Sequence, residues 1–267
     1  DQAGGALPSD LVQAVLETVG PDGRGTLWVG TRNGLAAFDG ARWRRAGAEP
    51  GFPSASVLSL LGSHDPKGAA ELWVGTTNGL YRLAGNRWRH WNEHSGLRNR
   101  SVQSLHECMG ADGRRTLWIG TDGAGIALLA MDEPEPAPVA LSDLGSPALP
   151  NGSIYSILED RSRRIYVSTN SGVSRLTPIA SGFRREEFSS EHGLPLNQGN
   201  RGAGLVDGQG RLWIGTIGGA AAFDPEVEFH DRRPKRLRLR GQPVGCVECA
   251  LFDRGTLAHR KSPGGGD

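Results

Sequence analysis

The residues in this sequence that are best suited to chemistry are arginines and side-chain amides that recur beside short turns. Guanidinium and amide groups together recognise carboxylates, sugars and polyanions. Asn is also favoured in tight turns for steric reasons, whereas turn geometry does not require Arg. An aromatic ring beside them, that of Trp91, could stack on a ligand or pack across strands. The candidate ligand-binding residues are Arg32, Trp91, Arg98, Asn99, Arg100, Asn197, Gln198, Asn200 and Arg201.

Catalytic motifs are absent from the sequence. It contains no Gly-x-Ser-x-Gly, no His-Glu-x-x-His and no phosphate-binding loop. The paired carboxylates, at 132–133 and 186–187, lie in polar stretches that are typical of solvated charge. We therefore predict no catalytic residue, no metal site and no cofactor.

The three cysteines are too few for a disulfide framework. Cys108 stands alone inside a repeat, whereas Cys246 and Cys249 form a C-x-x-C with His259 nearby. We expect incidental thiols. A redox or disulfide pair and a metal site are the alternatives.

Length, charge and hydropathy narrow the class of protein. The chain has 267 residues and a formal net charge of +1. A charge this small does not favour binding to nucleic acids or to membrane surfaces. No stretch approaches the roughly 18 apolar residues that span a bilayer. The opening residues, "DQAGGALPSD", include neither an initiator Met nor a leader pattern. We expect the chain to be a piece of a longer protein or a processed form.

One phrase recurs five times, as "TLWVGT", "ELWVGT", "TLWIGT", "RIYVST" and "RLWIGT". Its aromatic residues are Trp28, Trp73, Trp118, Tyr166 and Trp213, and these positions are 45, 45, 48 and 47 residues apart. Such a period fits propeller blades and also some helical repeats. No unit contains a long stretch with helical periodicity, so the helical repeats are excluded.

Each unit contains short β-like runs instead. In the first unit they are 11–19, 26–31, 35–39 and 42–45, and an Asn-Gly step between the second and third predicts a primed hairpin turn. Four strands per unit, repeated radially, form a β-propeller blade. We predict an all-β propeller with blades at about 7–52, 53–97, 98–150, 151–194 and 195–230. The last blade shows no clear fourth strand after Phe223, and the insert at 131–152 is expected to be a surface loop.

The units resemble the two-component regulator propeller repeats of bacterial sensor proteins. The resemblance covers residues 8–225 and is strongest in "SIYSILEDRSRRIYVSTNSGVSRL" and "GLPLNQGNRGAGLVDGQGRLWIGTIGGAAAFDP". Propellers of this family usually have seven blades, so we predict a C-terminal piece of a seven-bladed propeller, with closure into five blades as the alternative. The family continues into a triple-tyrosine domain, and "RRPKRLRLRGQPVG" is similar to its first strand. Residues 231–267 are therefore expected to begin a truncated following domain or to form a tail.

The resemblance implies a ligand-sensing module in the periplasmic part of an inner-membrane receptor, with a histidine kinase or diguanylate cyclase downstream. The expected partner is a small molecule or an oligosaccharide, and the module could also form a homodimer. We expect no nucleic acid, and contact with a membrane only through downstream segments. A lyase or glycosidase on a propeller scaffold is one alternative, which would need a His/Glu or metal centre near His94 and His192. A protein-interaction scaffold is the other.

Overall fold

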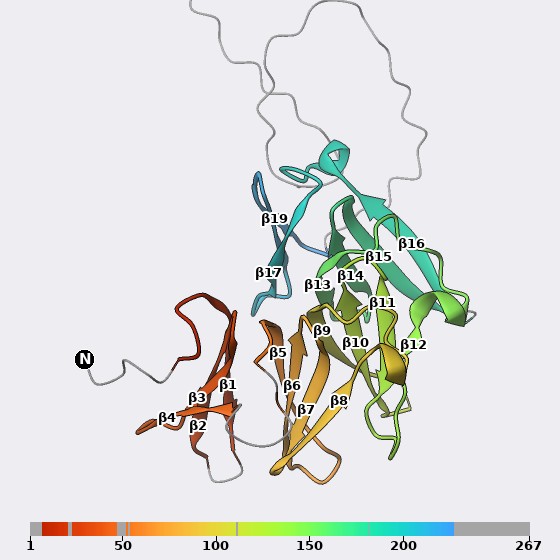
Figure 1. Ribbon diagram of the computed structural model, residues 1–267. Coiled ribbons are helices and arrows are strands. Elements are labelled where there is room, and N and C mark those ends of the chain that lie inside the picture. The colour runs from red at the N-terminus through yellow and green to blue at the C-terminus, as the bar shows by residue number, and fades with distance from the viewer. Residues whose placement is uncertain are drawn as a thin grey trace, which may run out of the picture.

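The computed structural model describes residues 7–226 apart from 21–22, 47–51, 53, 111 and 181. These residues form five antiparallel sheets that follow one another along the chain (Figure 1). The predicted all-β propeller is thereby confirmed. The domain boundaries at 230 and 231, the basic run that follows, and Cys246 and Cys249 lie outside the described residues.

Four blades have four strands each. Blade 1 contains β1 (Val12–Val19), β2 (Gly25–Thr31), β3 (Gly34–Phe38) and β4 (Trp43–Arg45). Blade 2 contains β5 (Val57–His64), β6 (Ala70–Thr76), β7 (Gly79–Ala84) and β8 (Arg87–Trp91). Blade 3 contains β9 (Val102–Met109), β10 (Arg115–Thr121), β11 (Ile126–Ala130) and β12 (Val139–Ala140). Blade 4 contains β13 (Ile154–Glu159), β14 (Ile165–Thr169), β15 (Gly172–Ile179) and β16 (Gly182–Phe188).

Blade 5 contains three strands within the described residues, β17 (Gly199–Val206), β18 (Leu212–Thr216) and β19 (Gly219–Phe223). The short 3-10 helices η2 (Glu93–Ser95), η3 (Leu141–Leu144) and η4 (Ser190–His192) lie between sheets. The insert at 131–152 is more than a surface loop, because it supplies β12, which pairs with β11 as the fourth strand of blade 3. Its Met131 and Leu141 are buried.

The first strand of each blade is its innermost strand, and these strands contact one another in chain order, β1 with β5, then β9, β13 and β17. The glycine of the repeated phrase permits this close approach. A methyl group on Gly75 would lie 2.7 Å from Cγ1 of Val102, the first residue of β9. A methyl group on Gly120 would likewise lie 2.7 Å from Cγ2 of Ile154, the first residue of β13. Each of these two junctions pairs a glycine with a bulky residue of the next blade. Val102 and Ile154 are fully buried there, so a larger residue at the glycine position would not fit without a shift.

At the junction between blades 4 and 5 the glycine and the larger residue have exchanged places. Ser168 stands at the glycine position of the phrase, and Gly199 begins β17 where Val102 and Ile154 begin theirs. A Cβ on Gly199 would overlap with Oγ of Ser168. The sequence departure "YVST" in blade 4 is therefore matched by a glycine on the neighbouring blade.

The threonine that ends the phrase closes each hairpin. Thr76 Oγ1 donates to the carbonyl oxygen of Gly79 over 2.9 Å and accepts from the backbone N–H of Asn78 over 2.9 Å. The same donor bond recurs at Thr31, Thr121, Thr169 and Thr216. The hairpins are confirmed, but the primed turn is wrong. Among the described non-glycine residues only Arg163 has a positive φ, so Asn33 and Asn78 do not adopt one. The hydroxyl bonds and the positive φ of the following glycine close the loop without it.

Candidate functional site

The innermost strands of the blades have two ends that carry different side chains. We call them the loop end and the turn end. The loop end carries the hairpins after the phrase and the segments that enter the next blade. Backbone bonds join these two kinds of loop, from the N–H of Gly79 to the carbonyl of Arg100 over 2.7 Å and from Gly172 to Asn197 over 2.8 Å. The turn end carries the turns at 65–69, 112–114, 160–164 and 207–211. The predicted ligand-binding residues belong mainly to the loop end.

Several of these residues serve the loops themselves. Arg98 donates to both carboxylate oxygens of Asp143, each over 2.7 Å, so its guanidinium already has an anionic partner. Asn99 donates to the carbonyl of Asp122 over 2.5 Å and accepts from the N–H of Ser101 over 2.8 Å. This is the turn role that asparagine commonly has.

Asn197 and Trp91 also have structural roles. The Oδ1 atom of Asn197 accepts from the N–H of Ser190 over 2.6 Å. At Gln198 the backbone carbonyl accepts from the N–H of Ile217 over 3.0 Å, and the side chain is exposed. Trp91 is 2% exposed, and its Nε1 donates to the carbonyl of Pro136 over 2.9 Å. Its ring is therefore part of the core between blades rather than a surface on which a ligand could stack.

Three arginines of the loop end have exposed side chains and no side-chain partner within the described part of the chain. They are Arg32 in the first hairpin, Arg100 before β9, and Arg201 in β17. Asn200 lies beside Arg201 and is also exposed. Both belong to a bulge in which residues 200–203 have no paired partner between the pairs of Gly199 and Gly204. Bulges redirect side chains and recur beside binding sites. These four residues and Gln198 are the members of the predicted set whose side chains are exposed without a side-chain partner in the described part of the chain.

The two histidines considered for an enzyme centre lie in different 3-10 helices. His94 lies within η2, whose N-cap Asn92 accepts from the His94 N–H over 3.0 Å. The ring of His192 caps η4, where its Nδ1 accepts from the N–H of Ser189 over 3.1 Å. Each histidine thus belongs to a separate 3-10 turn.

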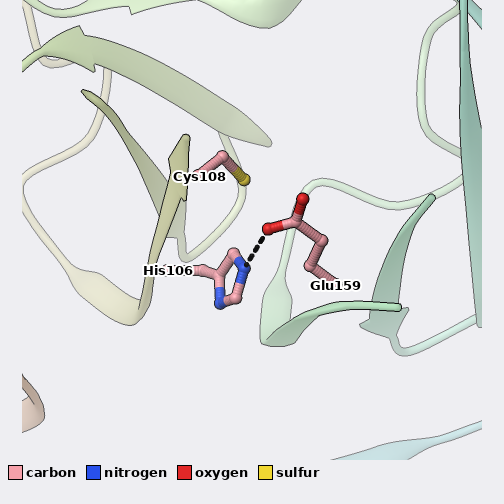
Figure 2. Close-up of side chains that lie close together, drawn as sticks. All are labelled: His106, Cys108 and Glu159. Atoms are coloured by element: carbon pink, nitrogen blue, oxygen red, sulfur yellow. Dashed lines mark hydrogen bonds and ion pairs between the residues drawn. The ribbon is translucent and has the colours of Figure 1, made fainter. Parts of the chain in front are cut away.

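The turn end contains a group that sequence analysis missed. The side chains of His106, Cys108 and Glu159 point toward one another between blades 3 and 4 (Figure 2). One ligand atom from each lies within 4.8 Å of the other two, and Nε2 of His106 is 3.4 Å from Oε2 of Glu159. All three residues are half-buried. Cys108 is therefore not the isolated thiol that its place in the sequence suggested.

Burial controls the protonation of this group. It raises the pKa of the Cys108 thiol well above its usual range, and the adjacent Glu159 carboxylate raises that pKa further. Burial also lowers the pKa of His106, against the opposing effect of Glu159. The second oxygen of Glu159 accepts from Nη1 of Arg163 over 3.0 Å.

Cavities lie elsewhere and are apolar. A small, partly open space of about 20 Å³ lies between blades 4 and 5, beside Tyr166, Phe188 and Phe223. An open depression of about 270 Å³ on blade 5 is lined by Leu205, Trp213 and small residues. Neither contains a charged side chain, so neither resembles a catalytic cleft.

A family model decides the nature of the repeat. The model described as "Two component regulator propeller" matches residues 148–171, which include β13, the turn after it and the whole of the phrase in blade 4. The chain carries a two-component regulator propeller repeat. The other described blades share the antiparallel strand order of this repeat, with three strands in blade 5.

Solved structures share the fold. The extracellular domain of the hybrid two component system BT4673 from B. thetaiotaomicron is 23% identical with a TM-score of 0.59, and the match covers 84% of this chain and 27% of that one. The corresponding domain of BT3049 from the same organism is 18% identical with a TM-score of 0.55, covering 82% and 34%. A catalytically inactive virginiamycin B lyase from Staphylococcus aureus is 15% identical with a TM-score of 0.51, covering 83% and 74%. At these identities the likeness establishes the fold.

The chain spans 27% and 34% of the length of the first two structures. No curated protein sequence matches it. Among the residues that the structure describes, no helix is long and apolar enough to cross a membrane.

Proposed function

We propose that this propeller is a ligand-sensing module from the extracytoplasmic part of a bacterial signal-transduction receptor. The match of the two-component regulator propeller to residues 148–171 carries the proposal. The likeness to extracellular domains of hybrid two-component systems supports it. A histidine kinase or a diguanylate cyclase would be the output, joined through segments that follow the propeller.

The ligand would bind at the loop end through Arg32, Arg100, Asn200 and Arg201. Unpaired guanidinium groups favour an anion, because a charge-assisted hydrogen bond is about twice as strong as a neutral one. An oligosaccharide that carries carboxylates, or a small organic acid, has this chemistry. Arg98 is a weaker candidate, since a ligand would have to displace the carboxylate of Asp143.

The enzyme alternative has only the fold likeness to the lyase in its favour, and this likeness does not transfer an activity. A protein-interaction scaffold and a homodimer would use surface rather than a polar pocket. The apolar residues exposed on blades 1 and 5 suit such contacts.

A ligand screen tests the proposal. The chain is heated with acidic oligosaccharides, organic acids or peptides, and binding is measured by calorimetry for any compound that raises the melting temperature. We expect one anionic class to stabilise the protein and Arg201→Ala to weaken its binding at least tenfold. Arg114→Ala is the matched control, because Arg114 is an exposed arginine of the turn end.

Three results would contradict the proposal. They are a panel in which no compound stabilises the chain, binding that survives both Arg100→Ala and Arg201→Ala, and turnover of the ligand by the isolated chain. The last would favour the enzyme alternative.

A further inference from the structure

His106 occupies a position that the other four blades fill with leucine. In each blade one residue of the innermost strand pairs with the aromatic residue of the phrase, and in blade 3 His106 pairs with Trp118. The equivalent residues are Leu16, Leu61, Leu158 and Leu205. Leu61, for example, packs there against the core cluster that blades 2 and 3 share. An imidazole has polar nitrogens that need partners when buried, so packing does not explain the histidine.

Strand geometry brings two further groups to this histidine. His106 and Cys108 are two residues apart on β9, and alternate residues of a strand project from the same face. Glu159 is the last residue of β13, the innermost strand of the adjacent blade. Figure 2 shows the imidazole and the sulfur facing the carboxylate across the junction. Three different ligand types thus converge from two blades.

The spacing suits a metal ion. In a tetrahedral zinc site, with bonds of about 2.0–2.3 Å, neighbouring ligand atoms lie about 3.3–3.6 Å apart. Nε2 of His106 and Oε2 of Glu159 are already 3.4 Å apart. The sulfur of Cys108 lies within 4.8 Å of one ring nitrogen of His106 and of one carboxylate oxygen of Glu159, so an adjustment on the order of 1 Å completes the set.

The surroundings also suit a metal. The bond from Arg163 holds one oxygen of Glu159 and leaves the other for coordination. Outer hydrogen bonds of this kind orient metal ligands. Half-burial gives an ion access to the ligands.

We propose that His106, Cys108 and Glu159 bind one divalent transition-metal ion, with zinc as the best fit, and leave its fourth position open to water. A thiolate with an imidazole selects zinc and related metals over magnesium and calcium, which prefer oxygen ligands. The thiolate and the carboxylate together balance the charge of a divalent ion. Because the ligands come from β9 and β13, the ion joins blades 3 and 4 at the turn end.

Cobalt spectroscopy tests the site directly. The chain is prepared with Cys246→Ser and Cys249→Ser, so that Cys108 is its sole thiol, and is titrated with Co²⁺ under reducing conditions. We expect one equivalent to produce a thiolate-to-cobalt charge-transfer band with the visible bands of tetrahedral cobalt. Zn²⁺ should displace the cobalt and abolish both.

Two variants remove ligands, and a third serves as the control. His106→Leu installs the residue of the other blades, so we expect it to fold, to lose the tetrahedral spectrum and to bind cobalt at least tenfold more weakly. Cys108→Ser should lose the charge-transfer band. His64→Gln changes an exposed histidine at the end of β5 and should leave the titration unchanged.

The outcomes separate a built site from adventitious binding. Loss of the spectrum in both ligand variants, with His64→Gln unchanged, supports the site. The absence of a thiolate band in the starting protein overturns it. A band in His106→Leu that forms with undiminished affinity also overturns it, because the thiol would then bind cobalt without the proposed partners.

Discussion

Blades 2 and 5 contain the same repeated phrase, but its tryptophan has very different surroundings in the two. Trp73 of blade 2 is completely buried and stacks on Trp91 with ring centroids 5.5 Å apart. Trp213 of blade 5 is 37% exposed, and its Nε1 donates to Asp207 over 2.9 Å. The phrase specifies a strand and a hairpin in both blades. The neighbouring blade determines how much burial the tryptophan gains.

The innermost strands of the first and last blades both expose apolar residues. Val15 of β1 is 61% exposed, whereas Ile157, its equivalent in β13, is 4% exposed. Leu205 of β17 is 58% exposed, whereas its equivalent Leu158 is 9% exposed. Blades 2 to 4 each have a neighbour on both sides along the chain, and blades 1 and 5 have one. The apolar residues of the terminal blades therefore correspond to residues that inner blades bury. A C-terminal piece of a larger propeller would have this pattern, and the blade number stays a prediction.

The largest effect should come from the two tryptophans. Trp73→Ala removes a buried ring from the core, and we expect the free energy of unfolding to fall by about 3–5 kcal/mol. Trp213→Ala should cost less, about 1–2 kcal/mol, since 37% of that residue is already exposed. Urea denaturation of both variants measures the difference. Equal losses would show that the open face of blade 5 is covered in solution.

The exchanged junction between blades 4 and 5 offers the next test. Gly199→Val places a side chain against Ser168 and should cost about 1–3 kcal/mol of stability. Combining it with Ser168→Gly recreates the arrangement of Gly75 with Val102, so we expect the double variant to recover most of the loss. A double-mutant cycle measures the coupling. Additive losses would mean that the two residues do not compensate one another.

The hairpin threonines should behave alike in all blades, because their bonds lie within one hairpin. Thr76→Val removes the hydroxyl that bonds Gly79 and Asn78. We expect a loss of about 1 kcal/mol, and a similar loss for Thr216→Val in blade 5. Thermal or urea unfolding of both variants gives the comparison. A much smaller effect in blade 5 would extend the difference between blades to the hairpins.

Much of the fold could be predicted because each repeat is a local unit. The expected strand at 11–19 is observed as Val12–Val19, and the one at 26–31 as Gly25–Thr31. Alternation and turn residues act within a few positions, so sequence periodicity reveals them. The primed turn was wrong because Thr31 and Thr76 close their loops by side-chain bonds that a dipeptide rule does not include.

The candidate sites were less predictable because they depend on contacts between blades. The sequence left Trp91 with two alternatives, stacking on a ligand or packing across strands, and the structure places it against Trp73. Arg98 could not be matched with Asp143, 45 residues away. His106 did carry a signal, since aligning the repeats places it in a column of leucines. Its meeting with Glu159 requires two adjacent innermost strands, which a single repeat does not reveal.

The smallest expected effect concerns acid stability at the turn of blade 5. The bond from Trp213 Nε1 to Asp207, with further bonds from Arg211 and from the N–H of Gln209, lowers the pKa of that carboxyl against the opposing effect of burial. A carboxyl with a lower pKa in the folded state stabilises the fold above its unfolded value of about 4 and loses that contribution as pH falls toward its folded value. We therefore expect the wild type to melt above Asp207→Asn at pH 6 to 7, and the gap to close as the pH falls below about 4. Melting temperatures across that range measure the gap. A gap that stays constant with pH would assign the role of Asp207 to neutral hydrogen bonds, which asparagine keeps in part, rather than to its charge.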